Sequence, residues 1–476
     1  MSNPKQRSTG TGSPGKNITK RKKRPSPPLK IVVALRNGDG LTRLSLLILG
    51  LGSLVRGQIG RFAAFFAVQA CYVIYMATAG VKSLAQIVHL GTVEQGEVYN
   101  DKLGIFEYSL GDNSMLILLY GVITIMITFG YICFMLGSAR CAYAAQTAAR
   151  DGRRQPKFRE DVASLFDANL HKLLLTWPIL GVLFFTIIPI IFMILIAFTN
   201  YDRNHQPPGN LFDWVGMTNF SAMLSTGGEF ASTFWPVLQW TIIWAICATS
   251  SCYILGMLLA IVINRKGTRI KSFWRFCFVL SIAMPAFVSL LTMRTVFANN
   301  GAYNILLRSI GMLAHTETFS YFGDAITAKL MVILINIWIG VPFTMLTTTG
   351  ILQNIPAELY EAANVDGASP VRTFISITLP YMLFVTTPYL ITTFVGNINN
   401  FNVIFLLTGG GPDTLDYHVA GRTDLLVTWL YKLTIVNKDY NLGSVIGIAV
   451  FVLMATFSLI AYRQSGAYKN EEEFQK

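Results

Sequence analysis

Eight long stretches with almost no charge constrain the fold of this chain more than any other feature of its sequence. They cover approximately residues 62–81, 114–137, 173–199, 235–264, 276–296, 330–352, 381–407 and 443–462. A helix needs about twenty apolar residues to cross the roughly 30 Å hydrocarbon core of a bilayer. We therefore predict an all-α polytopic membrane protein with about eight transmembrane helices. The composition agrees, because 53% of the 476 residues are hydrophobic and only 13% are charged.

A ninth apolar run, residues 44–55, lies between Arg43 and Arg56. Its twelve residues are too few to span a bilayer. We expect an interfacial or re-entrant helix here.

The distribution of Lys and Arg predicts the orientation. With the N-terminus inside, 29 of the 38 Lys and Arg residues fall in cytoplasmic segments, as the positive-inside rule requires. Both termini are then cytoplasmic. We expect residues 1–42 to form a basic, disordered cytoplasmic tail. Because the positive charge is confined to this segment, it argues against a nucleic-acid partner and favours contact with membrane lipid. Residues 43–170 would hold the interfacial helix, the first two spans and a linker, and residues 171–476 a six-helix core.

The spans contain no Asp, Glu, Lys, Arg or His near their centres. Proton relays and acid–base catalysis need such groups, so we expect neither proton-coupled transport nor an enzyme. The six cysteines have no metal-ligand spacing and no histidine nearby, so no metal site is expected. If the chain moves a solute, the energy comes from another subunit.

Neutral amides lie in the middle of two spans. The sixth span carries Asn336, and the seventh carries Asn397, Asn399, Asn400 and Asn402. Amides suit the hydroxyls of a neutral polar ligand such as a sugar. Asn397 and Asn400 are expected to share a helix face. The alternative is that these amides hydrogen-bond between helices and hold the bundle together.

Aromatic and proline residues accompany these amides. Phe401 and Phe405, four apart, would offer rings to the apolar faces of a sugar. Pro285, Pro342 and Pro388 fall inside three spans, where each removes a helix hydrogen bond and favours a kink near a central site.

The loop between the sixth and seventh spans predicts a helix, a sharp turn and a second helix. Pro356 is suited to open the first helix, Gly367 to end it in a left-handed cap, and Ser369-Pro370 to begin the next. The loop is acidic and has only one basic residue, Arg372. That charge is unusual on the inner side and favours a protein partner over lipid, with a solvated connector as the alternative.

This loop, within 355–380, resembles the EAA signature of ABC importer permeases. Glu361-Ala362-Ala363, then Gly367, then Ile377-x-Leu379-Pro380 follow its spacing. The resemblance implies a type I ABC importer permease fold and a coupling helix that docks on the ATPase subunit. It places Glu361, Ala362, Ala363, Asp366 and Gly367 at that interface. ATP and Mg would bind to the ATPase, and this chain would bind no cofactor.

The last 250 residues are similar to the maltose/maltodextrin (MalF-like) permeases. The similarity rests on segments beginning at Asn336, Asn397, Thr408 and Ala420. It implies that residues of the sugar site are Asn336, Gly340, Phe343, Asn397 and Asn400. Three further positions of the family's site differ, because Ile282, Ala286 and Gly396 replace two aromatic residues and a serine.

The resemblance also implies the partners and the location. They are a second homologous permease, an ABC ATPase dimer, an extracytoplasmic solute-binding protein and an oligosaccharide. Residues 200–234 leave no room for the large external insertion of some members, which favours a Gram-positive cell membrane. We expect a maltodextrin permease. The alternatives are a permease for galactan-derived oligosaccharides, a self-sufficient carrier or channel, and a membrane scaffold.

Overall fold

The computed structural model describes residues 32–34, 36–101, 104–152, 154, 158–225, 227–265 and 267–464. Most of the predicted basic tail and the last twelve residues therefore lie outside the described part. The chain forms two compact units. One comprises Met1–Ala85 with Tyr120–Phe185, and the other comprises Gln86–Leu119 with Thr186–Lys476.

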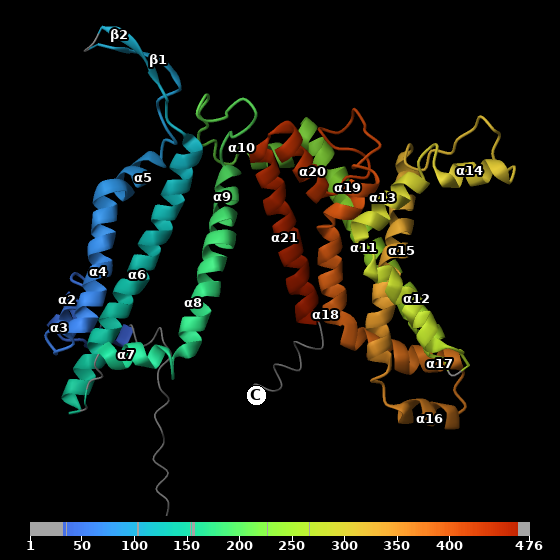
Figure 1. Cartoon of the computed structure of the whole chain (residues 1–476), viewed down its shortest axis with the longest axis horizontal. Coiled ribbons are helices and arrows are strands. Elements are labelled where there is room, and N and C mark those ends of the chain that lie inside the picture. Colours follow the sequence, from blue (N-terminus) through green and yellow to red (C-terminus); the bar gives the residue numbers. More distant parts are fainter. Residues whose placement is uncertain are drawn as a thin grey trace, which may run out of the picture. The chain divides into compact units, whose positions relative to one another are not determined.

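Helices dominate both units (Figure 1). The elements up to residue 187 are α2 (Gly40–Leu44), α3 (Leu51–Leu54), α4 (Ile59–Tyr75), η1 (Met76–Gly80), α5 (Val81–Gln86), β1 (Gly96–Asn100), β2 (Ile105–Ser109), α6 (Ser114–Arg150), α7 (Phe158–Leu165), α8 (Leu170–Val182) and η2 (Leu183–Ile187). The remaining elements are α9 (Ile188–Ile196), α10 (Thr218–Leu224), α11 (Glu229–Asn264), α12 (Lys271–Ala283), α13 (Ala286–Val296), α14 (Ala302–Ser309), α15 (Ala325–Leu352), α16 (Ala357–Val365), α17 (Pro370–Thr373), η3 (Phe374–Thr378), α18 (Leu379–Ile398), α19 (Phe401–Leu407), α20 (Leu426–Tyr431), η4 (Lys432–Asn437) and α21 (Tyr440–Gln464).

The described residues contain seven continuous helices that are long and apolar enough to cross a membrane. Helices α12 and α13 are apolar enough together but meet at an angle of 88°, the geometry of a broken span or of a re-entrant loop. Seven of the eight predicted spans are thus confirmed by length and composition, and the predicted span at residues 276–296 falls on the bent pair. The break falls at Met284-Pro285, as a proline without an amide hydrogen favours. By contrast, α15 and α18 continue through Pro342 and Pro388 without a break.

The ninth apolar run begins at the last residue of α2 and continues through a series of turns into α3, and these short elements agree with the prediction that it does not span. Its turns are held by side chains of two long helices of the same unit. The Leu49 amide donates to Gln69 Oε1 of α4 at 2.8 Å, and the Gly50 amide donates to Ser138 Oγ of α6 at 2.8 Å. These bonds satisfy backbone groups that a short apolar segment would otherwise leave unpaired.

The core of the larger unit is built around α11. Small residues of this helix, Ala245, Ala248 and Ala260, are fully buried, so neighbouring backbones approach it closely, as is typical of membrane helices. Two buried indoles add specific bonds. Trp240 Nε1 donates to the Thr423 carbonyl at 3.1 Å, and Trp244 Nε1 donates to the Asn397 carbonyl at 3.1 Å. Helix α11 thereby positions the end of α18 and the loop that precedes α20.

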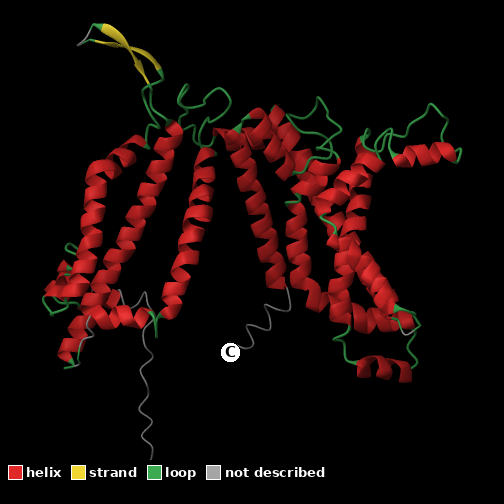
Figure 2. Ribbon diagram, in the orientation of Figure 1, coloured by secondary structure: helices red, strands yellow, loops and turns green. Residues whose placement is uncertain are grey.

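A hairpin of β1 and β2 was not predicted from the sequence. The strands are antiparallel, with Gly96 opposite Ser109 and Asn100 opposite Ile105. Figure 2 shows them as the sheet of the described residues. Each strand has only five residues. A sequence pattern of that length does not distinguish a strand from a loop unless the pairing strand is known.

Candidate functional site

Asn336 and Gly340 lie on one face of α15 and contact Cys252 of α11. Asn336 is 8% exposed, and its Nδ2 donates to Cys252 Sγ at 3.6 Å. A Cβ at Gly340 would come within 2.7 Å of the same sulfur. Only a glycine leaves room for this approach of the two helices. Both residues therefore have a packing role in the described structure.

Asn397 and Asn400 lie next to each other, but they do not share a helix face as predicted. Helix α18 ends at Ile398, and Asn400 is the N-cap of α19. Asn400 Nδ2 donates to Asn397 Oδ1 at 3.3 Å, while Asn400 Oδ1 accepts the Val403 amide at 3.3 Å. The prediction of a single helix over residues 381–407 is thus wrong. Side chains of the Asn, Ser, Thr and Asp type compete for backbone bonds and favour such a cap.

Asn397 also joins α18 to α11. The amide is 9% exposed, and its Nδ2 donates to Thr249 Oγ1 at 2.9 Å. With the bond from Trp244 to its carbonyl, Asn397 has partners on two groups of α11. The broken helix end is therefore fixed to the central helix by hydrogen bonds between buried polar groups.

The rings of Phe401 and Phe405 contact each other instead of lying open. Their centroids are 4.7 Å apart in a stacked arrangement. Tyr431 meets both rings edge-on, at 5.0 and 5.2 Å. These rings stabilise the junction of α19 with α20, so their faces are partly occupied by one another.

A cavity of about 510 Å³ opens at the break between α12 and α13. Phe343 and Trp338 of α15 contribute rings to it, and they are 53% and 64% exposed. Hydroxyls come from Ser281, Ser289 and Thr292, and the remaining lining residues are Ile282, Met284, Pro285, Ala286, Met293 and Ile339. Every one of these lining residues is uncharged. The cavity has the chemistry of a site for a neutral ligand with hydroxyl groups and apolar faces.

Of the predicted sugar-site residues, this cavity includes only Phe343. Asn336, Gly340, Asn397 and Asn400 are not among its lining residues. Ser281 and Ser289 were missed by sequence reasoning, although each is four residues from Pro285. Hydroxyls on either side of a helix-breaking proline were the available signal, because a proline break exposes the groups around it.

The loop between α15 and α18 folds as predicted. Pro356 precedes α16, Gly367 follows it with φ of +70°, and the Arg372 amide donates to Ser369 Oγ at the start of α17. No heavy atom lies within 4 Å of the position of a Cβ at Gly367. The need for glycine there is therefore the left-handed backbone and not a lack of space.

Helix α16 has one buried residue and a broad exposed surface. Ala363 is buried, whereas Glu361, Ala362, Asp366 and Gly367 are exposed. Leu359 and Val365 are exposed apolar residues, and Val365 is 88% exposed. Figure 1 shows α16 beyond the ends of α15 and α17. Apolar groups among acidic ones on a projecting helix form a surface that suits a protein partner.

A buried ion pair joins the folded loop between α19 and α20 to η4. Lys432 Nζ lies 2.7 Å from Asp424 Oδ2, and the Asp424 side chain is 0% exposed. The same oxygen accepts the Gly421 amide at 2.7 Å. Burial raises the pKa of the Asp424 carboxyl, while the ammonium of Lys432 opposes that shift. This pair, which the sequence gave no reason to connect, holds the loop against the first residue of η4, where α20 ends.

The described residues contain no group of three or more His, Cys, Asp or Glu side chains placed to hold a metal ion.

Comparison with known protein families identifies one that matches the second half of the chain. A family model, "Binding-protein-dependent transport system inner membrane component", matches residues 252–467.

Curated relatives are similar over most of the chain. The galactooligosaccharides transport system permease protein GanP of Bacillus subtilis is 36% identical, over 76% of this chain and 85% of that protein. The maltodextrin transport system permease protein MalC of Streptococcus pneumoniae is 32% identical, over 90% of this chain and 96% of that protein. MdxF of Bacillus subtilis, also a maltodextrin permease protein, is 32% identical over 90% of this chain and 95% of its own length.

A solved structure shares the fold. It is a chain of a bacterial ABC transporter involved in the import of the acidic polysaccharide alginate. The TM-score is 0.52 at 21% identity, and the match covers 63% of this chain and 96% of that chain.

Proposed function

This chain belongs to the family of inner-membrane components of binding-protein-dependent transport systems, and we propose that it is the permease subunit of an ATP-driven importer of neutral oligosaccharides. Maltodextrins are the preferred substrates and galactooligosaccharides the alternative, because both classes occur in the names of the similar permeases. The chain itself catalyses no reaction.

The observation that carries this function is the exposed helix α16, with the left-handed Gly367 at its end. Its surface combines the Glu361 carboxylate with the exposed apolar side chains of Leu359 and Val365. Such a helix at the end of two spans transmits a push from a docked protein to the membrane helices. Glu361, Ala362, Ala363, Asp366 and Gly367 form the coupling surface for an ATPase dimer, on which ATP and Mg bind.

The movement passes from α16 to α18 through a short path. Tyr360 and Thr378 share a hydrogen bond of 3.0 Å between their hydroxyls, which links α16 to η3. Helix α18 continues from η3 and ends at the Asn397 network. A displacement of α16 therefore reaches the break between α18 and α19, where it changes the solute pathway between inward and outward access.

The substrate pathway includes Asn336, Gly340, Phe343, Asn397 and Asn400. Support comes from the uncharged cavity at the α12–α13 break, to which Phe343 contributes its ring. A second homologous permease completes the pathway, and a solute-binding protein delivers the sugar from outside. The assembly lies in a bacterial cell membrane, of a Gram-positive organism, with both termini of this chain in the cytoplasm.

The coupling role is tested by purification in mild detergent from the native membrane, followed by mass spectrometry. A second permease and an ATPase should copurify with the chain, and Glu361→Gln should remove the ATPase while the permease pair remains. Glu97→Gln in β1 is the matched control, since it removes the same charge from an exposed residue of the β1–β2 hairpin. An unchanged yield of ATPase with Glu361→Gln would overturn the coupling role.

Transport is tested by reconstitution of the copurified complex in liposomes. Uptake of a maltodextrin should require ATP and should fall with Phe343→Ala. The chain by itself should move no solute. ATP-independent uptake by the chain alone would instead identify a self-sufficient carrier or channel. Preference for a galactooligosaccharide would assign the alternative substrate class.

Asn397 needs a control of its own because it has a partner on α11. Thr249→Val removes the hydroxyl that accepts from Asn397 Nδ2, whereas Asn397→Ala removes the amide. If the amide contacts sugar, only Asn397→Ala should reduce uptake beyond the effect of lost stability. Equal effects of the two variants on uptake and on thermal unfolding would show a purely structural amide.

A further inference from the structure

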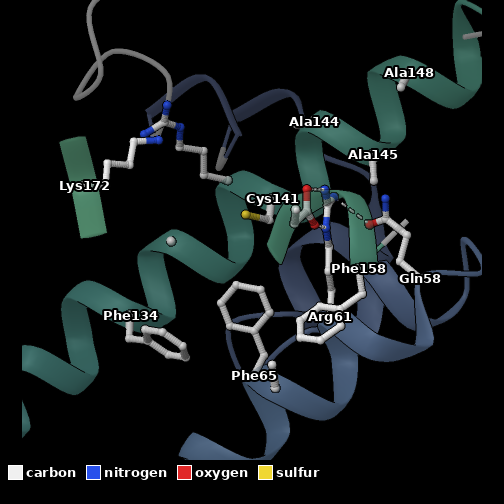
Figure 3. Close-up of a pocket in the computed structure, with 14 residues that line it drawn as sticks. Gln58, Arg61, Phe65, Phe134, Cys141, Ala144, Ala145, Ala148, Phe158 and Lys172 are labelled. Atoms are coloured by element: carbon white, nitrogen blue, oxygen red, sulfur yellow. Dashed lines mark hydrogen bonds and ion pairs between the residues drawn. The ribbon is translucent and has the colours of Figure 1, made fainter. Parts of the chain in front are cut away.

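A second cavity, of about 650 Å³, lies in the smaller compact unit between α4, α6, α7 and α8. It plays no part in the proposed transport pathway. Figure 3 shows Arg61 and Phe65 of α4 facing Cys141 and Phe134 of α6 around it. The lining combines basic groups with an apolar wall. A ligand with an anionic group and an apolar chain would match both parts.

Two of the three basic residues in the lining have no partner among the described residues. Arg61 is already neutralised, because its guanidinium forms an ion pair with Asp161, with Nη2 at 2.6 Å from Oδ1. Arg140 and Lys172 are exposed, and their side chains make no hydrogen bond or ion pair within the described part of the chain. The lining thus carries a net positive charge of two, concentrated on these two groups.

The wall beside these cations is smooth and apolar. Small residues of α6 recur at helical spacing through the cavity, at Gly137, Cys141, Ala144 and Ala148. The rings of Phe65 and Phe134 continue the wall. Helix α4 belongs to a candidate span, and none of its residues is buried among the described residues.

We propose that this cavity binds one anionic glycerophospholipid, with its phosphodiester between Arg140 and Lys172 and an acyl chain along the small-residue wall of α6. The charge complementarity identifies the headgroup, and the apolar wall distinguishes a lipid from a free anion. The site lies near the basic segment 140–172, which is on the cytoplasmic side according to the Lys and Arg distribution. Basic pockets between membrane helices on that side suit anionic lipid headgroups.

The test measures lipid binding to the purified full-length chain by native mass spectrometry. Phosphatidylglycerol should bind at least tenfold more tightly than phosphatidylcholine. Arg140→Gln with Lys172→Gln should remove that preference. The matched control is Arg150→Gln with Arg159→Gln, because these exposed residues of α6 and α7 carry the same charges outside the lining. The control variant should keep the preference.

Two further arms identify the ligand source and guard against misfolding. Ala144→Leu leaves every charge in place and adds a bulky side chain to the small-residue wall of α6, where the acyl chain would lie. This variant should therefore also weaken phosphatidylglycerol binding. Inorganic phosphate at millimolar concentration should not displace the lipid. Equal binding of the two lipids, displacement by phosphate, or normal binding by Ala144→Leu would each overturn the proposal. Elution as a single species and an unchanged unfolding temperature verify that each variant is folded.

Discussion

Lys432→Met should destabilise the larger unit because it leaves the Asp424 carboxylate buried without its cation. The carboxylate is 0% exposed, and its partner ammonium lies only 2.7 Å away. Removing one member of a buried ion pair costs about 3–5 kcal/mol. For a large domain, each kcal/mol shifts the unfolding temperature by about 2 °C, so we expect a fall of at least roughly 6 °C.

The double variant Asp424→Asn with Lys432→Met separates lost charge from lost packing. It removes both charges, and the asparagine oxygen still accepts the Gly421 amide that now donates to Asp424 Oδ2. Replacing both members of a buried pair is often close to neutral. We therefore expect the double variant to recover most of the lost stability, as measured by thermal unfolding of purified protein in mild detergent.

The pH dependence of Lys432→Met gives an independent check. Burial raises the pKa of the Asp424 carboxyl above its ordinary value, and loss of the ammonium raises it further. The folded state then holds its proton more tightly than the unfolded state, so stability is retained at acid pH and lost as the pH rises. A single variant as stable as the wild type, or a double variant less stable than the single one, would refute the reasoning.

Three further predictions concern other parts of the chain. Gly367→Ala should destabilise the end of α16 by about 1–2 kcal/mol because a side chain is disfavoured at its φ of +70°; faster hydrogen exchange confined to α16 and α17 would verify this. Gly340→Val should lower the unfolding temperature by several degrees, since a Cβ meets Cys252 Sγ at 2.7 Å, and Gly340→Val with Cys252→Ala should recover part of it. Burial alone raises the pKa of Asp39, but hydrogen bonds from Thr42 and Arg56 lower it to about 2. Protection of α2 from hydrogen exchange should therefore persist at pH 4 and decline only as the pH falls towards 2. Loss of this protection at pH 5 would contradict the role of Asp39.

Local chemistry made the coupling loop predictable. Pro356, Gly367 and Ser369 each act on the backbone within a few residues of their own position. Their effects therefore need no knowledge of distant contacts. The spans were predictable for a related reason, because a lipid solvent accepts only long apolar helices whose backbone groups are paired internally.

The seventh span shows where such reasoning fails. Its apolar run extends through Leu407, yet the helix ends at Ile398 and begins again at Phe401. The difference depends on α11, which binds the Asn397 carbonyl through Trp244 and the Asn397 amide through Thr249. These partners are about 150 residues away in the sequence, so the hydropathy of residues 381–407 does not predict the hydrogen bonds that end α18.

The sequence by itself determined the membrane class, seven of the spans, the caps of the coupling loop and the family resemblance, because each follows from local composition or spacing. Only the tertiary structure decided which side chains line a cavity and which hold helices together. It placed Phe343 in the neutral cavity but gave Asn397 and Asn400 partners within the chain. It also placed Arg140 and Lys172 in the lining of one cavity with an apolar wall. The physical reason is that the role of a side chain depends on which groups it contacts. Those contacts are set by the packing of helices that are distant in the sequence.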